Sequence, residues 1–131
     1  MKSIINLTQH PATPAQIAEG VENLSNDSLS ALHHFLDFSE LPTPSEIEAS
    51  VEGITTLASC WQDWQDPDTE CGAMIGGAPW IIAPLVRRLI LEGITPYFAY
   101  SQRVSQEVQM PDGSVQKTSV FEHRGFVQAI L

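Results

Sequence analysis

The sequence predicts a single α/β domain over residues 1–131: a mixed sheet with a parallel core, helices on both faces and a C-terminal antiparallel hairpin. Three observations predict this class. Short β-branched or apolar runs alternate with capped helical segments up to residue 101. The turn Gly76-Gly77 joins one run to a helix, as in open α/β folds. Two alternating segments flank Pro111-Asp112-Gly113, which is typical of a hairpin.

In the first half of the chain, residues 3–8 form the expected first strand, and residues 21–24 a brief second one. Helix starts are predicted at Pro14 and Pro44. Each proline follows a capping threonine, and the side chain two residues later, Gln16 or Glu46, closes a capping box. We expect these helices to end near Gly20 and near Asp63.

A further helix is expected from a cap at Asn26 or Asp27 to about Asp37. The apolar side chains of this helix and of the one from Pro44 recur at helical spacing, which predicts that one face of each is buried. The predicted inner faces are Leu29, Leu32 and Leu36 in the first helix, and Ile47, Val51, Ile54, Ala58 and Trp61 in the second.

In the second half, an acidic loop over 66–72 precedes a strand over 73–76 and a helix over 79–92. Pro84 predicts a kink or a restart in that helix, and Gly93 should end it. A buried strand is expected over 94–101. The segments 104–109 and 115–121 should form the hairpin, and 125–130 a final strand.

Composition limits the function. A net charge of −10 argues against binding of long nucleic acids. Residues 1–72 hold twelve acidic and one basic residue, whereas residues 73–131 hold four acidic and five basic ones, so a small anionic ligand fits the second half better. No apolar run approaches the roughly 18 residues of a membrane span. Two isolated cysteines, Cys60 and Cys71, and the lack of a signal peptide predict a cytoplasmic protein.

Three loops should meet where the parallel strands end: one with Asn6, Thr8, Gln9 and His10, the turn Gly76-Gly77-Ala78, and Ser101-Gln102-Arg103. A Gly-Gly turn before a helix offers free N–H groups to an anion. Arg103 could grip a phosphate with two N–H groups, and His10 is the acid/base candidate. Asn6, Thr8, Gln9, Gly76, Gly77 and Ser101 are therefore predicted to bind the ligand, with no metal and no cofactor.

The plan of the chain resembles small standalone CRISPR-associated proteins with a Rossmann-like fold, related to the CARF sensor domains and including the ring-nuclease type. The matching residues are Asn6, Thr8, His10 and Pro11 in the first loop, and Gly76, Gly77 and Pro79 in the second. The resemblance implies a homodimer that binds or cleaves a cyclic oligoadenylate, a second messenger of type III CRISPR defence. Cleavage would be metal-independent, with a ribose 2′-OH attacking the adjacent phosphate.

Two functions stay open. The first is binding of a small phosphorylated nucleotide, with or without its cleavage, in which His10 and Arg103 would be catalytic. The alternative is a non-enzymatic accessory protein, a protein-interaction or nucleotide-sensing module. The position of His10 and Arg103 relative to the Gly76-Gly77 turn distinguishes them. One pocket that holds all of these residues favours the nucleotide, whereas a closed pocket with Arg103 salt-bridged on a distant face favours the interaction module.

Overall fold

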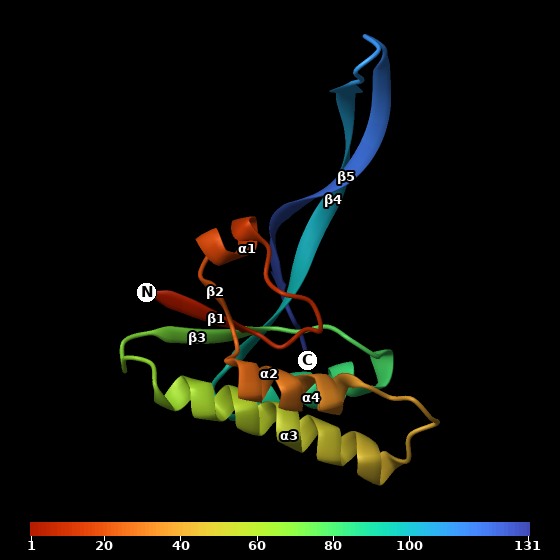
Figure 1. Cartoon of the computed structure of the whole chain (residues 1–131). Helices are drawn as coiled ribbons and strands as arrows, with labels where there is room; N and C mark the ends of the chain where they lie inside the picture. The colour runs from red at the N-terminus through yellow and green to blue at the C-terminus, as the bar shows by residue number, and fades with distance from the viewer.

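The computed structural model describes all residues 1–131 and shows a five-stranded mixed sheet in the order β2-β1-β3-β4-β5. The strands β1 to β4 run parallel, and β5 is antiparallel to β4, so the predicted α/β class is confirmed (Figure 1). The strands are β1 (Lys2–Asn6), β2 (Val21–Asn23), β3 (Glu70–Met74), β4 (Thr95–Gln109) and β5 (Val115–Gln128).

The helices cover the two faces of the sheet unequally (Figure 1). The helices α2 (Asn26–Leu36), α3 (Pro44–Asp63) and α4 (Pro79–Leu91) lie together on one face, and only the short α1 (Pro14–Ala18) lies on the other. This arrangement follows from the chain path. The connection β1–α1–β2 moves along the sheet in one direction, whereas the connection β3–α4–β4 moves in the opposite direction. Because both crossovers are right-handed, α1 and α4 lie on opposite faces of the sheet.

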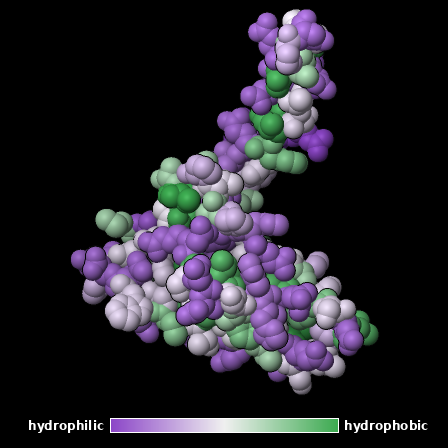
Figure 2. Space-filling model, viewed as in Figure 1, coloured by the Kyte–Doolittle hydropathy of each residue, from purple (hydrophilic) through white to green (hydrophobic).

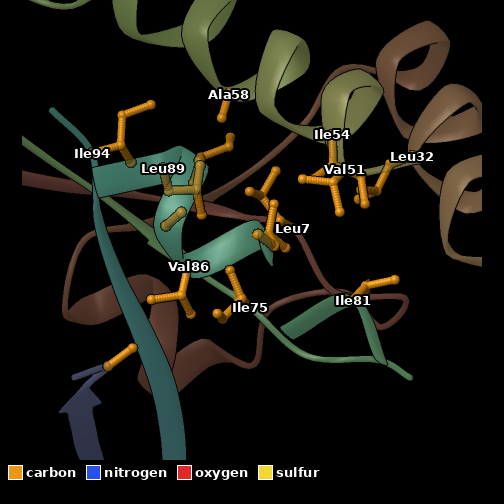
Figure 3. Packing of buried hydrophobic residues seen from close by; sticks show 14 of the residues in the cluster. Leu7, Leu32, Val51, Ile54, Ala58, Ile75, Ile81, Val86, Leu89 and Ile94 are labelled. Atoms are coloured by element: carbon orange, nitrogen blue, oxygen red, sulfur yellow. The ribbon is translucent and has the colours of Figure 1, made fainter. Parts of the chain in front are cut away.

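The main core lies between the sheet and the three-helix layer (Figure 3). Leu32, Ile54 and Leu89, one from each helix of that layer, are completely buried there. Leu7 and Ile75 continue the ladders of β1 and β3 into this core. A smaller cluster on the α1 face holds Ile4, Val21 and Met74, with Ala12, Tyr97 and Phe126 packed against it. The alternation of Ile4 and Ile5 between the two clusters shows that β1 is buried on both faces.

The local signals predicted most helix boundaries correctly. Both capping boxes are present, with Thr13 paired to Gln16 and Thr43 to Glu46, and α3 begins and ends at the predicted residues. The buried faces of α2 and α3 are also as predicted. The cap of α2 is a correction: it is Ser25, whose side chain makes no capping hydrogen bond. The helix α4 runs without a break through Pro84.

Several strand predictions are wrong in extent. The strand β1 begins at Lys2 and ends at Asn6, rather than running over residues 3–8. The strand β3 begins at Glu70 rather than at residue 73, because Glu70 to Gly72 pair with Lys2 to Ile4 of β1. The segments 94–101 and 104–109 are one strand, β4, and the segments 115–121 and 125–130 belong to one strand, β5, which ends at Gln128. The predicted turn is present: the Gly113 amide donates to the Met110 carbonyl, and Gly113 has φ +87°.

The end of β4 and the start of β5 project from the body of the domain as a two-stranded ribbon (Figure 1). We call residues 102–122 the arm. A register shift between Tyr100 and Ser101, opposite Gly125 with φ +140°, marks its base. The base is fastened to α1, because the His123 Nε2 lies 3.0 Å from the Glu19 Oε1 and the His123 side chain is buried.

Candidate functional site

An open cavity of about 430 Å³ lies at the carboxyl ends of β1 and β3, beside Phe98 and Ala99 of β4. It sits where the chain leaves β1 toward one side of the sheet and β3 toward the other, which is the position at which open α/β sheets bind ligands. We call it the switch-point cavity. Its lining residues are Thr8, Gln9, His10, Pro11, Thr13, Gln16, Met74, Ile75, Gly76, Gly77, Phe98 and Ala99.

Asn6 fixes the loop with Thr8 and His10, which forms the first wall of the cavity. Its Nδ2 donates to the His10 carbonyl at 2.7 Å and to the Asn23 Oδ1 at 2.9 Å, and its Oδ1 accepts the Thr8 amide at 2.9 Å. Asn6 is 3% exposed, so its amide is fully used inside the protein. The sequence predicted Asn6 as a ligand contact, but the structure places it as the residue that fixes the loop carrying Thr8 and His10.

The glycine turn forms the second wall. Gly77 has φ +119°, a backbone conformation that residues with a side chain rarely adopt. The backbone amides of Gly76, Gly77 and Ala78 make no hydrogen bond within the chain. They directly precede α4, a helix of 13 residues, whose N-terminal end adds a partial positive charge. The turn can therefore donate several N–H groups to an anion in the cavity.

The structure brings Thr8, Gln9, His10, Gly76 and Gly77 together around one cavity. His10 is exposed to solvent, while its carbonyl is held by Asn6. Its main chain is therefore fixed and its imidazole is free to meet a ligand. An imidazole on such a loop can transfer a proton to or from a ligand without a large reorganisation of the loop.

Ser101 and Arg103 do not line the switch-point cavity. The reason is that β4 does not end at Ser101 but continues into the arm, where Ser101 pairs with His123 and Arg103 with Phe121. The Arg103 guanidinium lies over the Phe121 ring, 5.3 Å from its centroid. Arg103 therefore packs within the arm and is not placed to bind a phosphate in the cavity.

Sequence reasoning did not include Gln16 among the site residues. It is buried at 9% exposure and lines the cavity, and its Oε1 accepts the Thr13 amide at 3.0 Å. That bond leaves the Nε2 donor free for a ligand. The capping box identified Gln16 correctly, but nothing in the sequence indicates that the start of α1 borders the cavity.

A second cavity of about 420 Å³ lies at the opposite ends of the strands, bordered by Lys2, Glu70, Cys71 and Gly93 among others. Its one cation, Lys2, lies over the Tyr97 ring at 4.2 Å. Burial, followed by the nearby Glu22 charge, raises the pKa of the Cys71 thiol, which makes it a weaker nucleophile at neutral pH. This cavity has no free-amide turn, so the switch-point cavity is the better ligand site.

No three side chains of His, Cys, Asp or Glu gather where they could hold a metal ion. No helix combines the length and apolar character needed to cross a membrane.

Comparison with known proteins gives a family but no relative of assigned activity. No curated protein and no solved structure matches the chain. The family model described as Uncharacterized protein MJ1673 family matches residues 2–127, which is nearly the whole chain. The chain therefore belongs to the Uncharacterized protein MJ1673 family.

Proposed function

We propose that the protein binds a small phosphorylated nucleotide, of which a cyclic oligoadenylate is the specific candidate, in the switch-point cavity. The observation that carries the proposal is the pairing of an accessible His10 with the unbonded amides of Gly76 and Gly77 around one cavity. A volume of about 430 Å³ accommodates one nucleotide unit, and ligand sites of this kind commonly fall between about 300 and 1,000 Å³.

The phosphate would be held by amide donors rather than by side-chain cations. Each hydrogen bond to a charged oxygen contributes about 1.5–3 kcal/mol. The chain carries a net charge of −10, so long-range electrostatics oppose the approach of an anion. Added salt should therefore screen this repulsion, and the affinity should hold or rise between about 50 and 200 mM salt. A site that depended on arginine or lysine would lose affinity instead.

Cleavage of the ligand is the finer part of the proposal. A ribose 2′-OH would attack the adjacent phosphorus, and the bond from phosphorus to the 5′-oxygen would break. The products are a 2′,3′-cyclic phosphate and a 5′-OH. His10 would take the 2′-OH proton or donate one to the leaving 5′-oxygen. The glycine-turn amides would stabilise the negative charge that develops on the phosphate. The nucleophile belongs to the ligand, so cleavage should persist with a chelator present.

The test is incubation with labelled cyclic oligoadenylates of several ring sizes, with and without EDTA. The variant His10→Ala should slow cleavage by about 10²- to 10⁴-fold and leave binding within about threefold, because proton transfer acts in the transition state. The matched control is His33→Ala, which removes another exposed histidine, from α2. A loss below about tenfold in His10→Ala would remove His10 from the chemistry.

A non-enzymatic interaction module remains the second candidate, because the arm exposes apolar side chains away from the cavity. Clean binding without cleavage of any ring size would make the protein a sensor of the nucleotide. Neither binding nor cleavage would leave the interaction module as the function. Under either function we propose a cytoplasmic homodimer, since both cysteines are free thiols and a two-fold symmetric ring fits a two-fold symmetric pair.

A further inference from the structure

The fold buries few polar side chains, whereas hydrophilic side chains cover much of the body of the domain in Figure 2. Asn6 and Thr55 are two of the buried ones, and their side-chain donors all have partners in the chain. His123 meets Glu19 through its Nε2, and its Nδ1 is sealed from any ligand. Gln16 differs, because its Nε2 has no partner in the chain and is not sealed. A donor on a buried side chain is costly unless a group from outside the chain accepts from it.

The capping box of α1 fixes the orientation of this side-chain amide. The Gln16 Oε1 accepts the Thr13 amide at 3.0 Å, so the oxygen faces the backbone and the two N–H groups of Nε2 are left for another acceptor. The box needs only the oxygen, because the exposed Glu46 fills the same position at the start of α3 with a carboxylate. The amino group of Gln16 is therefore not required by the cap, and Gln16 lines the switch-point cavity.

Gln16 and the glycine turn border the cavity from different sides of the sheet. Gln16 belongs to α1 on one face, whereas the turn leads into α4 on the other. A phosphate at the turn amides therefore leaves the Gln16 side of the cavity to the rest of the nucleotide. The lining also includes the apolar side chains of Pro11, Met74 and Phe98. Apolar walls with one placed neutral donor match the flat faces and the polar edge of a nucleobase.

We propose that Gln16 determines which base the switch-point cavity accepts, because its Nε2 donates to a ring nitrogen of the nucleobase. Given the nucleotide function proposed above, on which this rests, the ligand must present an unprotonated ring nitrogen toward α1, as adenine can at N1, N3 or N7. The Gln16 oxygen is turned toward the Thr13 amide, so the side chain presents donors to the base. A base with a donor or a C–H group at this point leaves the Nε2 unpaired, and the site selects against it.

Calorimetric titration of the wild type with a cyclic oligoadenylate and with its 1-deaza-, 3-deaza- and 7-deaza-adenosine counterparts tests this. Each counterpart replaces one ring nitrogen by C–H and keeps the phosphates. One of them should bind about three- to tenfold more weakly than the parent for each contacted base, the scale of one neutral hydrogen bond, and the other two should lose clearly less. Equal binding of all four ligands, or equal losses for all three counterparts, overturns this inference alone. A wild type that binds none of the four overturns the proposed function as well.

The variant Gln16→Glu assigns the lost hydrogen bond to Gln16. Glutamate keeps an oxygen for the Thr13 amide, as Glu46 does in α3, but it has no donor. The parent and the most weakened counterpart should therefore bind this variant within about twofold of each other. The added negative charge weakens both ligands alike and cancels in the ratio of their affinities.

Gln9→Glu is the matched control, because it makes the same change on the same cavity. The Gln9 Nε2 already donates to the Leu36 carbonyl at 3.4 Å, so this variant should keep the wild-type ratio. If Gln16→Glu does not fold, Gln16→Met removes the donor without a charge, and the same ratio is measured. A ratio that survives in the Gln16 variant, or one that Gln9→Glu abolishes equally, would overturn the assignment to Gln16.

Discussion

The glycine turn provides the sharpest test of the switch-point cavity, because its two glycines differ in backbone conformation. At Gly77, φ is +119°, and an added Cβ would meet Leu36 and Ile81 only at ordinary contact distances of 3.4 and 3.6 Å. At Gly76, φ is not positive, and a Cβ would lie 3.5 Å from the Thr8 Cγ2. Space is therefore available at both positions, and only Gly77 is restricted by its backbone conformation.

Gly77→Ala should lower the free energy of unfolding by about 1–3 kcal/mol, the cost of holding a residue with a side chain in this conformation. Gly76→Ala should change it little or raise it by up to about 1 kcal/mol, because alanine restricts the unfolded chain. If the Gly77→Ala turn relaxes instead, its amides will reorient, and anion affinity should fall by about 1.5–3 kcal/mol, the scale of one lost charge-assisted bond.

Urea unfolding and calorimetric titration with a cyclic oligoadenylate measure the two quantities separately. The expected pattern is a loss of stability, affinity or both in Gly77→Ala, with Gly76→Ala close to the wild type in each. Equal destabilisation by the two variants would show that sterics rather than backbone conformation set the turn. Unchanged affinity in a Gly77→Ala protein of clearly reduced stability would remove the turn from the binding site.

Two further predictions concern the body of the domain. Thr43→Ala should lower the free energy of unfolding in urea by about 1 kcal/mol, because it removes the side-chain cap of α3. Thr56→Ala removes only a hydrogen bond on the exposed side of the same helix and should lower it clearly less. Equal losses would contradict the capping role of Thr43. A thiol reagent should modify the exposed Cys60 before the half-buried Cys71. Because the pKa of the Cys71 thiol is raised, the reaction of Cys71 should accelerate only at higher pH. Rapid modification of Cys71 at pH 7 would contradict its burial.

The sequence predicted what local chemistry determines. The capping boxes at Thr13 and Thr43 use side chains within three residues of each cap, so α1 and α3 could be located without knowledge of the fold. Glu70 to Gly72 show no strand pattern, and they are a strand only because β1 lies beside them. The same holds for Ser101 and Arg103, whose polar run suggests the end of a strand.

The candidate site, like the fold, could be predicted from the sequence only in part. The loop with Thr8 and His10 and the turn with Gly76 and Gly77 follow strands whose ends meet, so their convergence could be predicted from parallel pairing alone. The third loop could not, because β4 passes the edge of the sheet and continues into the arm. Continuation of a strand into solvent depends on pairing with β5, a segment more than ten residues away along the chain.

The strand order also determines how long the centre of the sheet stays unfinished on the ribosome. The residues of β1 leave the exit tunnel first, yet their partners in β3, such as Glu70 for Lys2, follow 68 positions later. At about 5–20 residues per second, this gap lasts roughly 3–14 s. During that time Ile4 and Ile5 can pair only with the three-residue β2. A nascent chain stalled before Glu70 therefore presents an apolar strand with one open edge, which is a substrate for chaperones and a starting point for aggregation.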